Sequence, residues 1–135
     1  MSRQFRLLFQ DERIVVIDKP SGFHVHPPES GDDKVPRHKI VLHQLRDQIG
    51  KRVYPVHRLD ASTSGVLLFA LDSEAAGLLA QEFAHQRAKK DYQTVVRGYL
   101  PDEGEVAQDL DLDSTGKPVP ALTTYKTIAS IERTE

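Results

Sequence analysis

The stretch that decides the expected fold is His57-Arg58-Leu59-Asp60-Ala61-Ser62-Thr63-Ser64-Gly65-Val66-Leu67-Leu68-Phe69. Apolar and polar residues alternate just before it, and a wholly apolar run from Val66 to Leu71 ends it. This order predicts a strand, a tight loop and a buried strand, with Asp60 at the bend. On spacing alone, Asp60 is either a turn residue that bonds its own backbone or a carboxylate held rigidly for catalysis.

Length and composition set the outer limits of the interpretation. The chain has 135 residues, enough for one domain with a real hydrophobic core. It has no cysteine, which excludes a disulfide framework and thiolate chemistry. It has neither a signal-peptide core nor an apolar run near the roughly 20 residues that span a bilayer, so we expect a cytoplasmic protein. The net charge of −2 argues against a nonspecific polycation but leaves room for a local basic surface.

The periodicity along the chain predicts an α+β fold. Strands are expected over residues 6–10, 13–18, 53–56, 66–71, 90–100 and 121–131. A first helix is expected between Pro36 and Gly50, and a second helix capped by Asp72 or Ser73. Polar, turn-rich loops are expected over residues 29–35 and 102–118. Adjacent strand pairs with only two helices indicate one domain, 1–135, with a mixed, largely antiparallel sheet and flanking helices.

Three motifs resemble those of the RluA-type pseudouridine synthases, in the order of that family. The central stretch from His57 to Leu68 resembles the family's central motif. Asp18-Lys19-Pro20-Ser21-Gly22, followed by His24 and His26, resembles the N-terminal signature, and Lys90-Asp91-Tyr92 resembles the Lys-x-Tyr motif. Leu45-Arg46-Asp47-Gln48-Ile49-Gly50 and Ser73-Glu74-Ala75 are most similar to members that act on tRNA.

The resemblance implies the pseudouridine synthase fold, a mixed sheet flanked by helices and loops. The family has a later motif, rich in Arg, His and Gln, whose arginine pairs with the catalytic aspartate. The present sequence ends before that motif, in a strand-like pattern, at Ile131-Glu132-Arg133-Thr134-Glu135. We therefore expect the N-terminal portion of the catalytic domain, truncated at the C-terminus and without an accessory RNA-binding domain in front.

The resemblance also implies the chemistry. Pseudouridine formation breaks the bond between uracil N1 and the ribose, turns the base and rejoins it through C5, so the base must first leave its stem. By resemblance Asp60 is the catalytic aspartate, acting as a nucleophile on the ribose or the ring, or as the base that forms a glycal. Tyr92 would stack on the flipped base and could exchange a proton. Without the family motif, Tyr92 could equally be a core tyrosine on a strand.

Basic side chains near these motifs are candidates for RNA contacts. By resemblance, Arg58 is expected to support the RNA around the vacated base position; the alternative is a surface arginine that pairs with Asp60 or a neighbouring acid. His57 is expected to contact backbone or RNA phosphate, with a structural role as the alternative. Further phosphate contacts, whose affinity would fall with added salt, are expected from Lys19, Arg52 and Lys90, together with Lys89 and Arg97. Each could equally be a solvated surface charge.

Three other site types fit poorly. His24, His26 and His57 could be metal ligands, but no partner at a recognised zinc spacing accompanies them. His57 to Asp60 is similar to a kinase catalytic loop, yet the residue order differs and no glycine-rich loop precedes it. Ser114-x-x-Lys117 has the spacing of a serine–lysine acylase but lacks companion motifs.

The resemblance thus implies an RNA pseudouridine synthase that acts on tRNA, and we expect it to be a monomer with no cofactor, metal, membrane or protein partner. The alternatives are a ribosomal RNA pseudouridine synthase and a noncatalytic RNA-binding part of such an enzyme.

Overall fold

The computed structural model describes residues 4–27, 35–111 and 116–132, which form two compact units, Met1–Lys90 and Asp91–Glu135. Most of the expected loop at 29–35 and Ser114 of the serine–lysine pair lie outside the described residues. No described helix has the length and apolar character needed to cross a membrane.

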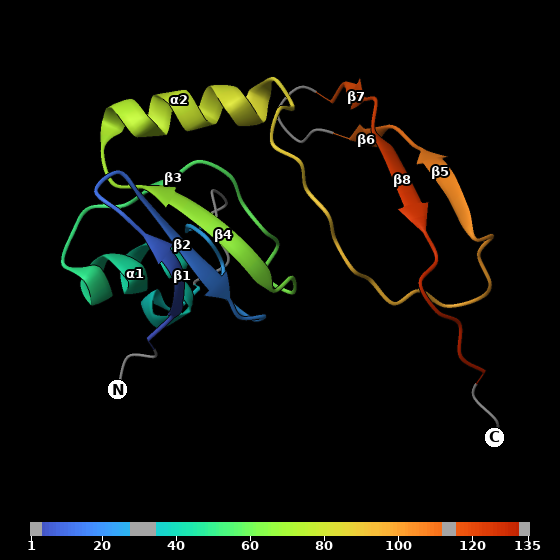
Figure 1. Ribbon diagram of the computed structural model, residues 1–135, viewed down its shortest axis with the longest axis horizontal. Coiled ribbons are helices and arrows are strands. Elements are labelled where there is room, and N and C mark those ends of the chain that lie inside the picture. Colours follow the sequence, from blue (N-terminus) through green and yellow to red (C-terminus); the bar gives the residue numbers. More distant parts are fainter. Residues whose placement is uncertain (1–3, 28–34, 112–115, 133–135) are drawn as a thin grey trace. The chain divides into compact units, whose positions relative to one another are not determined.

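The first unit is built on a four-stranded antiparallel sheet (Figure 1). Its strands are β1 (Arg6–Gln10), β2 (Ile14–Lys19), β3 (Tyr54–Pro55) and β4 (Gly65–Ala70), in the spatial order β1-β2-β4-β3. The central pair β2 and β4 runs in continuous register from Ile14↔Ala70 to Lys19↔Gly65. The predicted α+β class and largely antiparallel sheet are confirmed. β3 is only two residues long, and Pro55, which has no N–H to donate to a ladder, lies on this edge strand.

Three helical segments accompany the sheet. The 3₁₀ turn η1 (Arg37–Lys39) follows Pro36, and α1 (Val41–Ile49) begins only after it and ends at Gly50 with a φ of 66°. Gly50 thus provides the left-handed C-terminal conformation that the sequence predicts. The helix α2 (Ser73–Ala84) is capped by Asp72, whose carboxylate accepts from Ala75 N at 2.7 Å. The sequence also predicts this cap, at Asp72 or Ser73.

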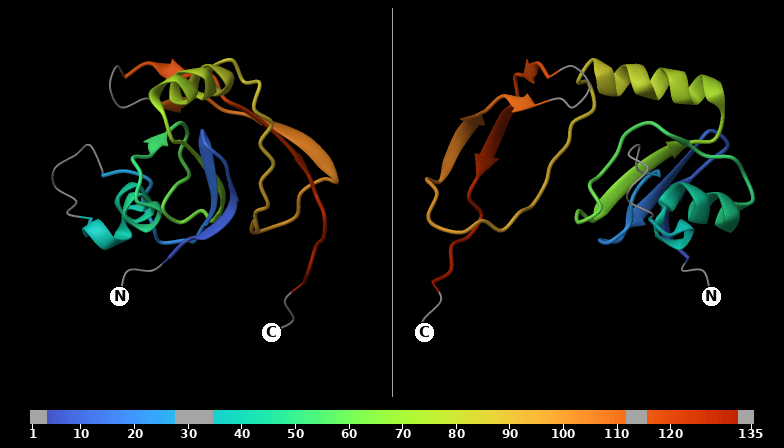
Figure 2. Two further views of the ribbon diagram at one scale, coloured as in Figure 1. Left: turned by 60° about the vertical axis from the view of Figure 1, so that its left-hand side comes forward. Right: turned by 180° about the vertical axis from the view of Figure 1, so that it is seen from behind.

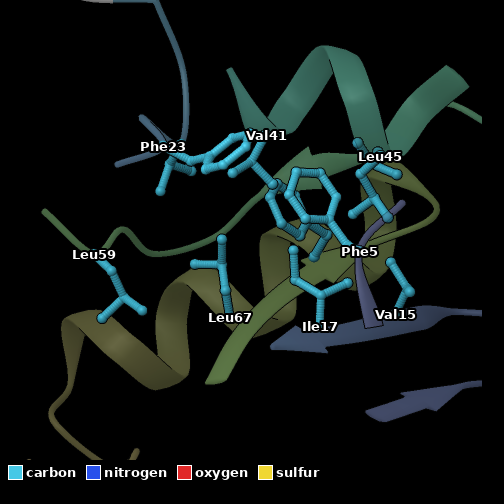
Figure 3. Close-up of a cluster of buried hydrophobic side chains, with 11 residues drawn as sticks. Phe5, Val15, Ile17, Phe23, Val41, Leu45, Leu59 and Leu67 are labelled. Carbon is cyan, nitrogen blue, oxygen red and sulfur yellow. The ribbon is translucent and has the colours of Figure 1, made fainter. Parts of the chain in front are cut away.

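The helix α1 lies against one face of the sheet (Figure 2), and the hydrophobic core fills the space between them (Figure 3). Val15 and Ile17 of β2 alternate with less buried neighbours and point into it, as do Leu67 and Phe69 of β4. Val41 and Leu45 contribute the apolar stripe of α1. The remaining members are Phe5, Phe23, Val25, Val53 and Leu59. Leu59 ties the loop between β3 and β4 to this core.

The second unit holds two short antiparallel ladders. β5 (Glu103–Ala107) pairs with β8 (Leu122–Lys126), and β6 (Leu110–Asp111) pairs with β7 (Pro118–Val119). β8 falls within the strand expected over 121–131, but the loop expected over 102–118 was wrong because β5 lies there. Gly104 faces Tyr125 across the ladder, where an added Cβ would lie 2.5 Å from the phenol oxygen.

The strand predicted over Lys90–Leu100 is wrong. Residues 91–100 hold no strand and are exposed throughout, with Val95 98% exposed. Their alternation of apolar and polar residues suits a strand, but a strand also needs a neighbour to accept its backbone hydrogen bonds. Among the described residues, no strand pairs with this segment.

Candidate active site

The loop between β3 and β4 presents the Asp60 carboxylate to solvent. Leu59 is only 8% exposed and lies in the core, whereas Arg58 and Asp60 on either side of it are exposed. Leu59 thus anchors the loop in the core, while both of its neighbours lie at the surface. A turn follows, in which Thr63 N donates to Asp60 O at 3.0 Å. The turn uses the backbone carbonyl of Asp60 and leaves its side chain exposed, and the role of the carboxylate stays a prediction.

The turn after β2 braces this loop from one side. Gly22 N donates to Ala61 O at 2.7 Å, and Ser21 Oγ donates to Ser62 O at 2.9 Å. Gly22 has a φ of 86°, a conformation that side-chain-bearing residues rarely adopt. Two segments some 40 residues apart in the chain are therefore joined immediately beside Asp60.

Lys19 is the centre of the brace. Its side chain has no exposed surface, and its Nζ donates to Phe23 O at 2.9 Å, Pro20 O at 3.2 Å and Ala61 O at 3.4 Å. Burial lowers the pKa of Lys19, and the negative charge of Asp60 opposes that shift. We expected Lys19 to contact RNA phosphate, but in this position the ammonium is surrounded by carbonyl oxygens. Its geometry is that of a positioning residue.

His57 links the sheet to α2. Leu68 N donates to its Nε2 at 3.0 Å, and its ring stacks on Phe83 with centroids 4.6 Å apart. Burial, and then the charge of Lys90, lower the pKa of His57. Because Nε2 accepts a hydrogen bond, the neutral ring carries its proton on Nδ1. This arrangement fits the structural alternative for His57 and disfavours the charged imidazolium that a phosphate contact would use.

The other candidate cations are exposed. Arg58 is free to reach solvent, and among the described residues no ion pair joins it to Asp60. The guanidinium of Arg52 lies over the Tyr54 ring, 4.9 Å from its centroid. Lys90 is exposed at the end of the first unit. Phosphate contacts by these three residues stay predictions.

Tyr92 belongs to the second unit and is 61% exposed. Its side chain is therefore accessible and not part of a core, contrary to the alternative of a core tyrosine. Its approach to Asp60 stays a prediction.

A polar cavity of about 340 Å³ opens beside the braced loop. It is lined by Gln4, Phe5, Arg6, Asp18, Lys19, Pro20 and Ser64. Asp60 is not one of its lining residues, so this cavity does not enclose the carboxylate. In the described part of the chain, no group of three or more His, Cys, Asp or Glu side chains could hold a metal ion.

Sequence reasoning missed the residues that fix the loop. Ser21, Gly22 and Phe83 were visible, the first two inside a quoted motif and the third on a helix stripe, but nothing in the sequence paired them with Ser62, Ala61 and His57. The single available signal was that the Lys-Pro-Ser-Gly turn and the Asp60 loop both belong to motifs of one family.

Comparisons with known proteins define the class. Residues 13–135 match the family described as RNA pseudouridylate synthase, so the chain belongs to that family. It is 44% identical to tRNA pseudouridine synthase C of Pectobacterium carotovorum and 41% identical to tRNA pseudouridine synthase C of Pasteurella multocida, over 93% of its own length in both cases. The chain spans 35% and 55% of the length of these two relatives.

Two human structures share the fold. RNA Pseudouridylate Synthase Domain Containing 4 aligns with a TM-score of 0.65 at 22% identity, covering 93% of this chain and 54% of that one. RNA Pseudouridylate Synthase Domain Containing 1 aligns with a TM-score of 0.70 at 21% identity, covering 92% and 52%. The expected family resemblance and fold are confirmed.

The buried His57 predicts a dependence of stability on pH. Its pKa in the folded protein lies below the ordinary 6.5, so the unfolded chain takes up the proton more readily. The stabilisation is complete above about pH 6.5 and is lost as the pH falls through the lowered value in the folded protein. In the full-length protein, His57→Gln should make the free energy of unfolding less dependent on pH between 7 and 5, measured by urea denaturation. The exposed His38→Gln serves as control, and equal pH slopes in His57→Gln and wild type would contradict this view of His57.

Proposed function

We propose that the protein is an RNA pseudouridine synthase that converts uridine to pseudouridine in tRNA, with Asp60 as its catalytic residue. The observation that carries the proposal is the Asp60 carboxylate, exposed on a loop that Lys19, Ser21 and Gly22 hold in place. Membership of the pseudouridylate synthase family supports the reaction, and the names of the relatives support tRNA as substrate.

The reaction requires the uridine to leave its stem, at a cost of about a few kcal/mol for unstacking and unpairing. Asp60 then acts on the everted nucleotide. The bond between uracil N1 and ribose C1′ breaks, the base turns, and C5 bonds to C1′; the C5 hydrogen is lost as a proton and N1 gains one, so the reaction is an isomerisation. Attack on the ribose, attack on the ring and glycal formation each satisfy this balance. A carboxylate suits the first two because its ester can be reversed.

The other named residues have supporting parts in this proposal. Tyr92 stacks its ring on the turned base, and its hydroxyl moves a proton in the last step. Arg58, exposed next to Asp60, contacts the RNA around the vacated position, and Arg52 and Lys90 contact phosphate. The reaction needs no cofactor or metal. We further propose that the enzyme works as a monomer in the cytoplasm, where its RNA substrate is found.

Replacing the carboxylate tests the catalytic assignment. In the full-length protein, Asp60→Asn should reduce pseudouridine formation in tRNA by at least about 10³-fold, because a positioned reacting group is lost, while tRNA affinity stays within about threefold. Pseudouridines are mapped after incubation with tRNA and, separately, ribosomal RNA. Asp109→Asn, which changes an exposed aspartate of the second unit, is the control. Substantial turnover by Asp60→Asn would refute the assignment of Asp60 as the catalytic residue. Modification of ribosomal RNA alone would show that ribosomal RNA, and not tRNA, is the substrate. RNA binding by the wild-type protein without any modification would favour the noncatalytic alternative.

The phenol of Tyr92 is tested by removing its hydroxyl alone. Tyr92→Phe keeps the stacking ring, so the tRNA dissociation constant should stay near the wild-type value. The single-turnover rate should fall by about 10²-fold, the usual contribution of one positioned proton donor or acceptor. Tyr99→Phe, which removes another exposed phenol in the same unit, is the matched control. A wild-type rate in Tyr92→Phe would show that the Tyr92 hydroxyl does not transfer a proton in the reaction.

A further inference from the structure

The segment 37–52, which contains η1 and α1, carries an excess of positive charge. Residues 37–52 contain five lysines and arginines and one carboxylate, in a protein whose formal net charge is −2. We call the exposed side chains of Arg37, Lys39 and Arg46 the basic track. The exposed His38 and the partly buried His43 lie in the same segment.

The basic track is connected by backbone contacts to the loop that carries Asp60. Gly22 N donates to Ala61 O at 2.7 Å, and two residues later His24 N donates to Lys39 O at 2.9 Å. His24 and Ile40 form an isolated parallel bridge, which fixes the start of α1 beside this turn. The Lys39 ammonium lies over the Phe23 ring, 4.9 Å from its centroid. One short turn therefore separates Lys39 from the Asp60 loop.

Two guanidinium groups of the track are held together by a single acid. Arg37 Nη2 lies 3.2 Å from Asp47 Oδ2, and Arg46 Nη2 lies 2.9 Å from Asp47 Oδ1. All three side chains are about half exposed, and ion pairs of this kind contribute about 0–1 kcal/mol to stability. Two positive charges against one negative charge leave an excess, and the planar guanidinium fork matches a phosphate group well.

The pKa of the partly buried His43 reflects the same excess of positive charge. Burial lowers its pKa first, the charges of Arg37 and Arg46 lower it further, and Asp47 opposes them. The arginines thus outweigh the acid at this point of the surface.

The surroundings favour an RNA backbone over a membrane. A helix that binds a lipid surface places large apolar side chains beside its basic ones. Among the described residues, the exposed large apolar side chains come from β1, β4, α2 and the second unit, and none comes from 35–52. A basic, hydrophilic surface that begins next to the reacting loop fits a strand of phosphates.

We propose that the basic track binds the phosphate backbone of the tRNA strand that leads away from the everted uridine. This rests on the proposed function, and it adds a docking surface distinct from the reacting residues. The track supplies affinity and orientation, and Asp60 supplies the chemistry. Removing track charges should therefore weaken binding while leaving the rate of the bound complex unchanged.

The test compares two double variants of the full-length protein. Arg37→Gln/Arg46→Gln removes two charges from the track. Arg13→Gln/Arg87→Gln removes two equally exposed, ion-paired arginines that contact Asp72, Glu74 and Glu82, at the ends of α2. The tRNA dissociation constant is measured against salt concentration by filter binding. The track variant should bind about tenfold more weakly at 0.15 M salt and lower the salt slope by about 1 per arginine, whereas the control should match the wild type.

Two further readouts separate this proposal from the proposed function. The single-turnover rate at saturating tRNA should be unchanged in the track variant, and Asp47→Asn should bind tRNA more tightly than wild type because it removes the opposing charge. Equal affinity and salt slope in the track variant and wild type would overturn the docking surface and leave the assignment of Asp60 intact. An equal loss in both double variants would do the same. A wild-type protein that binds no tRNA would overturn both the docking surface and the proposed function. An inactive enzyme with intact track-dependent binding would overturn the proposed function alone.

Discussion

A buried ammonium group holds the candidate active site together. Lys19 has no exposed surface, and its Nζ donates to carbonyl oxygens of its own turn and of the loop that carries Asp60. An unpaired charge inside a protein costs far more than a single hydrogen bond contributes. The ammonium is therefore stable only where those carbonyls converge, so the position of one loop fixes the position of the other.

This constraint gives the Asp60 carboxylate a defined direction. Leu59 anchors the loop in the hydrophobic core, and the hydrogen bonds of Ser21 and Gly22 attach it to the turn after β2. A reacting group must be held near its productive geometry by side chains that are themselves fixed. Here that support comes from the sheet end at β2, while Asp60 itself stays accessible. The same turn connects the loop to the start of α1, so the proposed docking surface and the proposed catalytic loop are both attached to it.

The sequence predicted most of the first unit because its signals are local. The apolar run after Gly65, the Asp72 cap and the Gly50 stop each act within a few residues. The strand over Lys90–Leu100 was wrong because alternation shows that a segment suits a strand but not which strand pairs with it. The sequence did not predict the burial of Lys19, because its ammonium is held in part by a carbonyl of Ala61, 42 residues away. The structural role of His57 likewise depends on its stacking against the ring of Phe83 in α2. Such contacts are properties of the fold and leave no local pattern.

Amide hydrogen exchange in the full-length protein measures the brace directly. The N–H of Gly22 and the N–H of Thr63 both donate into the Asp60 loop, so in the wild type we expect them to exchange as slowly as amides of β2. Lys19→Met removes the ammonium but keeps an apolar side chain of similar length, and it should release both amides while those of β2 stay protected. Lys51→Met, at an exposed position, should change neither. Rapid exchange of Gly22 and Thr63 in the wild type, or unchanged protection in Lys19→Met, would contradict the account.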